Sequence, residues 1–403
     1  MWKDIKIKSA FTSKKTPLVF YLKASFLCID TINHQSYHRN FPFRKFEILI
    51  KKIFMILYSP IKFRSLELQN RWVMSPMCMY SCENGVANDF HFVHYASRAQ
   101  GGTGLLIVEA TGVVPDGRIT HKCTGLWNDE QTQAFKKIVD FVHQNSKSKI
   151  GIQLGHAGRK ASTWNGKQLS LEEGWETVAP SKIPYAEGER IPHELTVPEI
   201  KKLVQDFKEA TRRSLEAGFD VIEIHAAHGY LIHQFMSPLS NVRTDEYGGS
   251  FENRIRFLVE IVDVVNELLD ENHPLFVRIS GTEYAENGWD LDESVRLAEV
   301  LKNKNVDLID VSSGGNIAGA KISLFDGYQV PLSAEIKKET GIKTGAVGLI
   351  KSAEHAEEIL QKEEADLIFV AREILRNPYL AIQGSFEGKE ECDFPHQYER
   401  ARI

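Results

Sequence analysis

The sequence predicts an eight-stranded parallel α/β barrel, the (β/α)8 or TIM barrel fold, and three observations carry this prediction. Short apolar runs rich in β-branched residues recur along the chain, as is typical of buried parallel strands. Segments with helical spacing of apolar residues fall between them, and right-handed crossovers close such a series into a barrel. Polar side chains follow several of the runs, at the strand ends where barrel active sites lie.

The individual elements follow one another in regular alternation. Eight runs are candidate strands: 71–77, 104–110, 149–154, 220–225, 274–280, 307–312, 343–347 and 366–371. Helices are expected over 130–144, 196–217, 250–271, 290–303 and 352–362. A doubly wound open sheet is the structural alternative, but no Gly-x-Gly-x-x-Gly motif follows the first run. The insert at 159–197, after the third strand, is too long for an ordinary connection and is expected to cover the substrate.

The N-terminal segment differs in charge from the rest of the chain. Residues 1–54 hold 11 basic and 3 acidic residues, a net charge of +8, which leaves −13 for the remainder of a chain whose net charge is −5. The segment makes a poor transit or signal peptide. We therefore expect a barrel domain at 55–403 with residues 1–54 as an appendage. An upstream start assignment and a genuine extension without function explain the appendage equally well.

Composition excludes several classes of protein. The net charge of −5 argues against a dedicated nucleic-acid binder. The five cysteines are widely spread and include no Cys-x-x-Cys pair, so no disulfide framework is indicated and a cytoplasmic location fits best. No apolar run reaches the roughly 20 residues that a transmembrane helix needs.

The most informative motif is Ile224-His225-Ala226-Ala227-His228-Gly229-Tyr230, at the end of the fourth run. On a continuing strand His225 and His228 would point to opposite faces, so the chain must turn after His225, and Gly229 makes such a turn possible. Two imidazoles and a phenol can polarise a carbonyl and deliver a proton.

Two other interpretations of these histidines are a structural role and a metal site. A metal-dependent hydrolase would need further ligands at other strand ends, and a Schiff-base aldolase would need a lysine within a strand.

Other strand ends supply groups that suit a flavin phosphate. Glycines, backbone N–H groups and an arginine after the last two strands are the usual phosphate-binding arrangement of this barrel. A glutamine can bond a heterocycle edge, and an arginine within a strand can stabilise negative charge on a reduced ring. The residues in question are Cys78, Tyr80, Gln153, Arg278, Gly345, Gly348, Ala371 and Arg372.

The sequence resembles the old yellow enzyme family of FMN-dependent ene-reductases, and within it the bacterial-type, thermophilic-like NADPH dehydrogenases. The resemblance covers about residues 57–402 and leaves residues 1–54 outside. The matching stretches are 70–80 (NRWVMSPMCMY), 153–160, 222–231, 237–241, 243–250 (RTDEYGGS), 345–348 and 397–400 (QYER).

This resemblance implies a role for each matching position. FMN would be bound by Ser75, Pro76, Met77, Cys78, Ala110, Gln153, Arg278, Gly348, Ala371 and Arg372, with Cys78 beside the flavin ring. His225 and His228 would hold the substrate carbonyl, Tyr80 would contact the substrate, and Tyr230 would donate the proton. Arg400 would reach the active site of a neighbouring subunit, which implies a homo-oligomer, a dimer or a tetramer.

The implied activity is reduction of an activated C=C bond in an α,β-unsaturated carbonyl or nitro compound, with NADPH as the hydride donor. Two positions depart from the family pattern: Ala371 stands where glycine is usual, and Gly155 replaces a frequent alanine with little expected effect. The cysteine cluster of the iron–sulfur branch is absent. A metal-dependent barrel hydrolase and a catalytically silent flavoprotein are the alternative functions.

Overall fold

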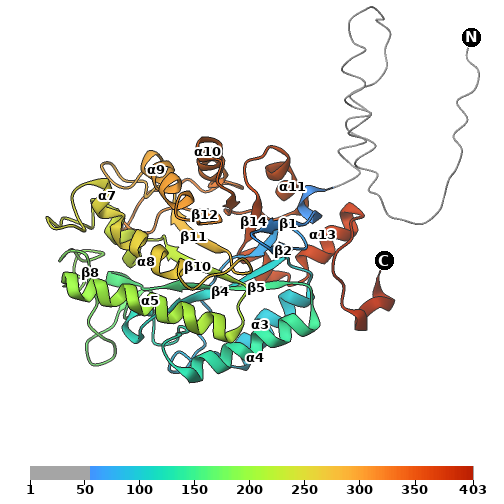
Figure 1. Cartoon of the computed structure of the whole chain (residues 1–403), viewed down its shortest axis with the longest axis horizontal. Helices are drawn as coiled ribbons and strands as arrows, with labels where there is room; N and C mark the ends of the chain where they lie inside the picture. The colour runs from blue at the N-terminus through green and yellow to red at the C-terminus, as the bar shows by residue number, and fades with distance from the viewer. Residues whose placement is uncertain (1–54, 403) are drawn as a thin grey trace, which may run out of the picture. The chain divides into compact units, whose positions relative to one another are not determined.

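Eight parallel strands close into a barrel in the part of the chain that the computed structural model describes, residues 55–402 (Figure 1). In sequence order they are β3 (Trp72–Met74), β4 (Leu105–Gly112), β5 (Lys149–Gly155), β10 (Val221–Ala226), β11 (Leu275–Ser280), β12 (Leu308–Ser312), β13 (Thr344–Ala346) and β14 (Leu367–Val370). Strand β14 pairs with β3 and completes the circle. The predicted TIM barrel is confirmed, whereas the predicted appendage at 1–54 lies outside the described residues.

Each predicted run overlaps one barrel strand, although the boundaries differ. The first run, 71–77, is a strand only over Trp72–Met74. Pro76 has no N–H to donate to a ladder, so the chain leaves the sheet before it. In contrast, β4 continues two residues beyond the predicted end at 110, with a shift in register between Val108 and Thr111.

Helices surround the strands (Figure 1). Those between and after the barrel strands are α3 (Asp89–Gln100), α4 (Asp129–Asn145), α5 (Val197–Ala217), α6 (Leu231–Met236), α7 (Phe251–Arg254), α8 (Arg256–Asn266), α9 (Leu291–Lys302), α10 (Val330–Thr340), α11 (Ala353–Gln361), α12 (Arg372–Arg376) and α13 (Leu380–Gly388). Helix α5 begins at a capping box in which Thr196 and Glu199 bond reciprocally, and it ends at Gly218 with φ of 91°. None of the helices within residues 55–402 has the length and apolar character to cross a membrane.

The insert after β5 has little regular structure. It contains a short hairpin, β6 (Thr163–Trp164) with β7 (Lys167–Gln168), and one small parallel pair, β8 (Val178–Ala179) with β9 (His193–Glu194). The insert thus departs from an ordinary connection, as its length predicted.

Two apolar clusters stabilise the barrel. The larger fills the space between strands and helices. The smaller lies inside the barrel, mainly at the amino ends of the strands, and includes an N-terminal hairpin, β1 (Ile61–Phe63) with β2 (Leu66–Leu68). Phe63 of this hairpin packs edge-on against Phe276 of β11, with ring centroids 5.0 Å apart. The hairpin therefore closes the end of the barrel opposite to the strand ends that carry the polar groups.

Replacement of Phe63 by alanine is expected to lower the free energy of unfolding by about 3–5 kcal/mol, the usual cost of removing a buried aromatic ring. Urea unfolding followed by far-ultraviolet circular dichroism measures this loss. Lys62→Ala on the exposed face of the same strand is the control, because Lys62 makes only an exposed ion pair with Glu67. Equal effects of the two substitutions would contradict a closing role for the hairpin.

Candidate active site

The chain turns sharply after β10, as the two histidines required. His228 has φ of 59° and Gly229 has φ of 70°, two successive left-handed residues. A Cβ at position 229 would collide with the backbone of Gly315 and Asn316, so only glycine allows this close approach. The turn brings the rings of His225 and His228 to a centroid separation of 5.1 Å. It also places the Tyr230 ring 5.0 Å from that of His225.

Hydrogen bonds orient both imidazoles. The backbone N–H of Ala227 donates to Nδ1 of His225 at 3.2 Å, so the His225 proton lies on Nε2. Nε2 of His228 lies 2.7 Å from Oγ of Ser312, and its Nδ1 lies 3.4 Å from Nε2 of His225. When the Ser312 hydroxyl donates to His228, two imidazole N–H groups converge on one point. A carbonyl or nitro oxygen is the acceptor that such a pair would bind.

Burial sets the protonation of these three side chains. It lowers the pKa of His225 and of His228 well below the ordinary value, and the nearby Arg278 charge lowers both further. Burial raises the pKa of Tyr230 well above the ordinary value. The imidazoles are therefore neutral donors and the phenol keeps its proton, the state that a general acid requires.

Charged side chains lie one layer below, inside the barrel. Arg278 Nε lies 3.0 Å from Oδ2 of Asp310 on the neighbouring strand, and its Nη2 donates to Oγ of Ser75 at 3.2 Å. Gln153 donates to Glu223 at 2.9 Å across β5 and β10. Burial, with the Asp310 charge adding to it, raises the pKa of Glu223 to about 8. One arginine thus stands among two buried carboxyl groups, Glu223 and Asp310.

The loop after β3 is fixed from below by β4. The backbone N–H of Met79 donates to Oε2 of the buried Glu109 at 3.0 Å.

Cys78 is half-buried. Its contact with Cys123 is the main cause that raises the pKa of its thiol, and burial raises this pKa further. Tyr80 has φ of 51° and remains 44% exposed. The Cys78 side chain is therefore a neutral thiol on a fixed loop. Half-buried Pro76 and Met77 share this loop, and half-buried Ala110 follows Glu109 on β4.

A cavity of about 370 Å³ lies at the ends of β13 and β14, within the range of small-molecule sites. Its lining includes Gly348, Ala371 and Arg372, together with Lys351 and Arg376. No ion pair involves Arg372 within residues 55–402, whereas Lys351 and Arg376 pair with acidic neighbours. Ala371 has φ of −103°, so its methyl group needs no left-handed backbone. A basic cavity with glycine in its wall fits a flavin phosphate.

A second cavity, of about 340 Å³, opens beside Tyr230. Tyr80 and Lys160 line it, and the insert contributes Trp164, Tyr185 and Glu189. The Lys160 ammonium lies 5.1 Å from the Tyr230 ring centroid. The insert therefore forms part of the wall of this cavity, which fits the expectation that it covers the substrate.

Gly155, at the end of β5, lies directly against His225. A Cβ built at this position would approach Cβ of His225 to 3.2 Å, which is tighter than an ordinary van der Waals contact. An alanine at position 155 would press against the Cβ of His225, so this position affects where His225 lies. The sequence alone had predicted little effect of glycine here.

The predicted residues of seven barrel strands lie at or near the carboxyl ends of those strands, whereas Arg400 on the C-terminal tail lies apart from them. Arg400 is exposed in the 3-10 helix η4 (His396–Ala401) and lines neither of the two cavities described above. The sequence analysis missed four acids that are completely buried: Glu109, Glu223, Glu283 and Asp310. A single acid within an apolar strand, as in Val221-Ile222-Glu223-Ile224, is the signal that could have found three of them. Within residues 55–402, no group of three or more His, Cys, Asp or Glu side chains is arranged to hold a metal ion.

Comparison with known proteins agrees with this geometry. The model of the NADH:flavin oxidoreductase / NADH oxidase family matches residues 56–385. A protein named NADPH dehydrogenase from Listeria innocua is 52% identical over 347 residues, which cover 86% of this chain and 98% of the relative. A namesake from Listeria monocytogenes matches to the same extent.

Solved structures show the same architecture. Morphinone reductase superposes with a TM-score of 0.69 at 27% identity, over 84% of this chain and 91% of that one. An old yellow enzyme homologue from Zymomonas mobilis gives 0.69 at 29% identity, over 83% and 93%. The chain belongs to the NADH:flavin oxidoreductase / NADH oxidase family, the family of the old yellow enzymes.

Proposed function

We propose that this protein is an FMN-dependent NADPH dehydrogenase that reduces the activated C=C bond of α,β-unsaturated carbonyl or nitro compounds. The observation that carries the proposal is the convergence of His225, His228 and Tyr230 at one strand end. Bound FMN would accept hydride from NADPH and pass it to the acceptor. Its ring and phosphate would be held by Ser75, Gln153, Arg278, Gly348 and Arg372.

The chain's own residues prepare the acceptor. The Nε2–H of His225 and the Nδ1–H of His228 would donate to the carbonyl oxygen and draw electron density away from the alkene. The β-carbon then becomes electrophilic. Tyr230, whose raised pKa keeps its proton, would protonate the α-carbon. Tyr80, Trp164 and Tyr185 would exclude water from the cavity.

The family membership favours this function over a metal-dependent hydrolase. A catalytically silent flavoprotein would show the visible absorbance of oxidised flavin but no turnover. The decisive assay measures that absorbance in the purified protein and then NADPH-dependent reduction of cyclohexenone, maleimide and nitroalkenes. Bound flavin without turnover of any of these acceptors would contradict the proposal.

Four free cysteines within the described residues agree with a reducing, cytoplasmic setting.

Tyr230→Phe is expected to slow enone turnover by roughly 100- to 10,000-fold, the usual contribution of a general acid. NADPH should still bleach the flavin absorbance at nearly the wild-type rate, because the phenol acts only on the acceptor. Stopped-flow measurement of the two half-reactions separates these effects. Nitroalkenes should suffer less, since water can protonate a nitronate later. Equal losses in both half-reactions would remove Tyr230 from this role.

His225→Ala and His228→Ala are each expected to abolish phenol binding. Phenolates mimic the enolate oxygen, and their binding to flavoproteins of this kind produces a long-wavelength charge-transfer absorbance. Titration of each variant with p-hydroxybenzaldehyde, at matched flavin content, measures the effect. A charge-transfer band of wild-type intensity in both variants would show that the oxygen binds elsewhere.

Arg400 is proposed to complete the active site of a neighbouring subunit in a homo-oligomer, either a dimer or a tetramer. Its guanidinium is exposed on the tail, and a planar, permanently charged group suits contact with substrate or cofactor oxygens. An Arg400→Ala chain mixed with a Tyr230→Phe chain should regain activity upon subunit exchange, because one mixed site holds its own Tyr230 and the partner's Arg400. Confirmed exchange without recovery, or a fully active monomer in sedimentation, would refute the shared site.

A further inference from the structure

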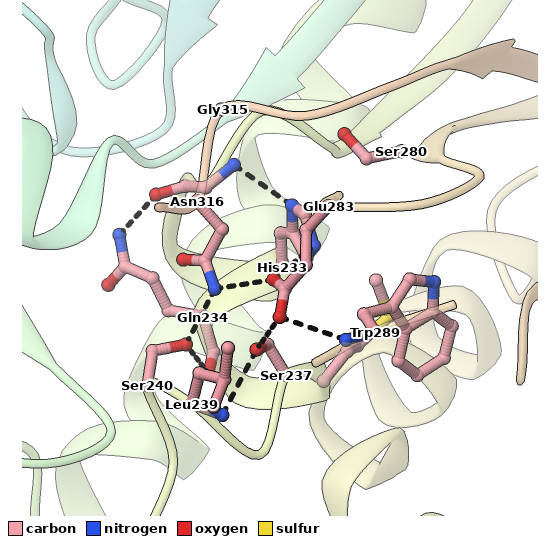
Figure 2. Close-up of polar contacts among 12 residues, drawn as sticks. His233, Gln234, Ser237, Leu239, Ser240, Ser280, Glu283, Trp289, Gly315 and Asn316 are labelled. Carbon is pink, nitrogen blue, oxygen red and sulfur yellow. Dashed lines mark hydrogen bonds and ion pairs between the residues drawn. The ribbon is translucent and has the colours of Figure 1, made fainter. Parts of the chain in front are cut away.

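A buried polar network contacts the turn that carries His228 and Tyr230 through His233. Figure 2 shows members of this network, among them His233, Glu283 and Asn316. The network joins α6, which follows the turn, to Glu283 after β11 and to Asn316 after β12. Glu283 is fully buried, as are His233 and Asn316. None of these three side chains lines either of the two cavities described above.

Glu283 is surrounded by donors. The Ser237 hydroxyl and the Trp289 backbone N–H donate to Oε1 at 2.8 and 2.9 Å, and the Asn316 amide donates to Oε2 at 2.7 Å. Burial alone would raise the pKa of this carboxyl, but donation from His233, Asn316 and Ser237 outweighs burial and lowers the pKa below its ordinary value. The group is therefore a carboxylate that can only accept hydrogen bonds.

This carboxylate determines the tautomer of His233. Nε2 of His233 lies 3.5 Å from Oε2 of Glu283, a long contact, and has no closer hydrogen-bond partner within residues 55–402. Its proton therefore points toward the carboxylate and leaves Nδ1 as an acceptor. Nδ1 receives the backbone N–H of Gly229 at 2.9 Å.

Gly229 is held from both sides, so its position fixes the turn. Its carbonyl oxygen accepts from Nε2 of Gln234 at 2.7 Å, while its N–H is held by His233. Gly315 packs so closely beneath that neither residue could carry a side chain. A displacement of the Gly229 N–H would pass directly to His228 and Tyr230, the residues on either side of Gly229.

We propose that Glu283 is a positioning residue for the oxygen-binding turn: its carboxylate keeps the His233 proton on Nε2, so that Nδ1 can hold the Gly229 N–H. This inference rests on the proposed function, because it assigns Glu283 a part in binding the acceptor oxygen. It adds to the site a residue that does not touch the acceptor.

Glu283→Gln tests the tautomer directly. The amide oxygen would remain with Ser237 and Trp289, so the amide NH₂ would face both Nε2 of His233 and the Asn316 amide nitrogen that donates to Oε2 in the wild type. The part of the effect that runs through His233 is the part that the double variant described below removes. His233 would then have to accept at Nε2 and carry its proton on Nδ1, where it would meet the Gly229 N–H. Two donors would oppose each other at the turn.

The readout is phenol binding by the FMN-loaded protein, followed through the charge-transfer band. We expect the Kd of p-hydroxybenzaldehyde to rise about tenfold or more in Glu283→Gln, as for one inverted buried hydrogen bond. Bleaching of the flavin by NADPH should be unchanged. Ser237→Ala is the matched control: it removes a donor to the same carboxylate but leaves the His233 tautomer alone, so its Kd should stay within about threefold of wild type.

A second substitution makes the test independent of folding. In His233→Asn the amide oxygen can take the place of Nδ1 and accept the Gly229 N–H whatever the charge at position 283. Glu283→Gln should therefore have little further effect on phenol binding in the His233→Asn background. If Glu283→Gln alone fails to load FMN, the double variant should load it.

The outcomes separate the two hypotheses. A wild-type protein that gives no charge-transfer band would overturn the proposed function. A normal band in wild type with equal Kd changes in Glu283→Gln and Ser237→Ala would overturn the positioning role alone. So would additive effects in the double variant, or a double variant that cannot be loaded.

Discussion

The left-handed turn at His228 and Gly229 is the constraint on which the candidate site depends. A strand alone would send His225 and His228 to opposite faces, and only the turn gives their rings a common point. The turn is stable because its neighbours are built around it. Lys160 donates to the His228 carbonyl at 2.7 Å, and Ser280 accepts the His228 N–H at 2.9 Å. Backbone strain at this turn is thus balanced by specific contacts from two other strand ends, those of β5 and β11.

Barrel closure explains why these contacts can converge. Parallel strands put all their carboxyl ends on one rim, so residues far apart in sequence become neighbours. Arg278 pairs in register with His225 on one side and Asp310 on the other. The same arginine that balances two buried carboxyl groups also lowers the pKa of both histidines. Charge inside the barrel therefore adds to burial in keeping the two histidines at its mouth neutral.

The sequence was sufficient to predict the fold and the residues at the strand ends, because both depend on local patterns. Apolar runs mark strands, and His225, His228 and Tyr230 follow one of them. The partners of these residues depend on register and closure, which no local pattern specifies. Glu283 illustrates the limit: it lies in a loop, and its role follows only from the positions of His233 and Asn316. The β1–β2 hairpin was missed for a similar reason, since three-residue strands are too short to show a period.

The turn that carries the two histidines and the cavity beside Tyr230 are built differently and serve different purposes. The turn is fixed by buried hydrogen bonds whose loss would leave donors unpaired, so its geometry is specified closely. The cavity in front is walled largely by side chains of the insert, such as Trp164 and Tyr185, which come from segments with little regular structure. Changes in that wall can alter which acceptors fit without disturbing the two imidazoles. In the proposed function, the choice of acceptor and the chemistry performed on it would therefore be carried by separate parts of the chain.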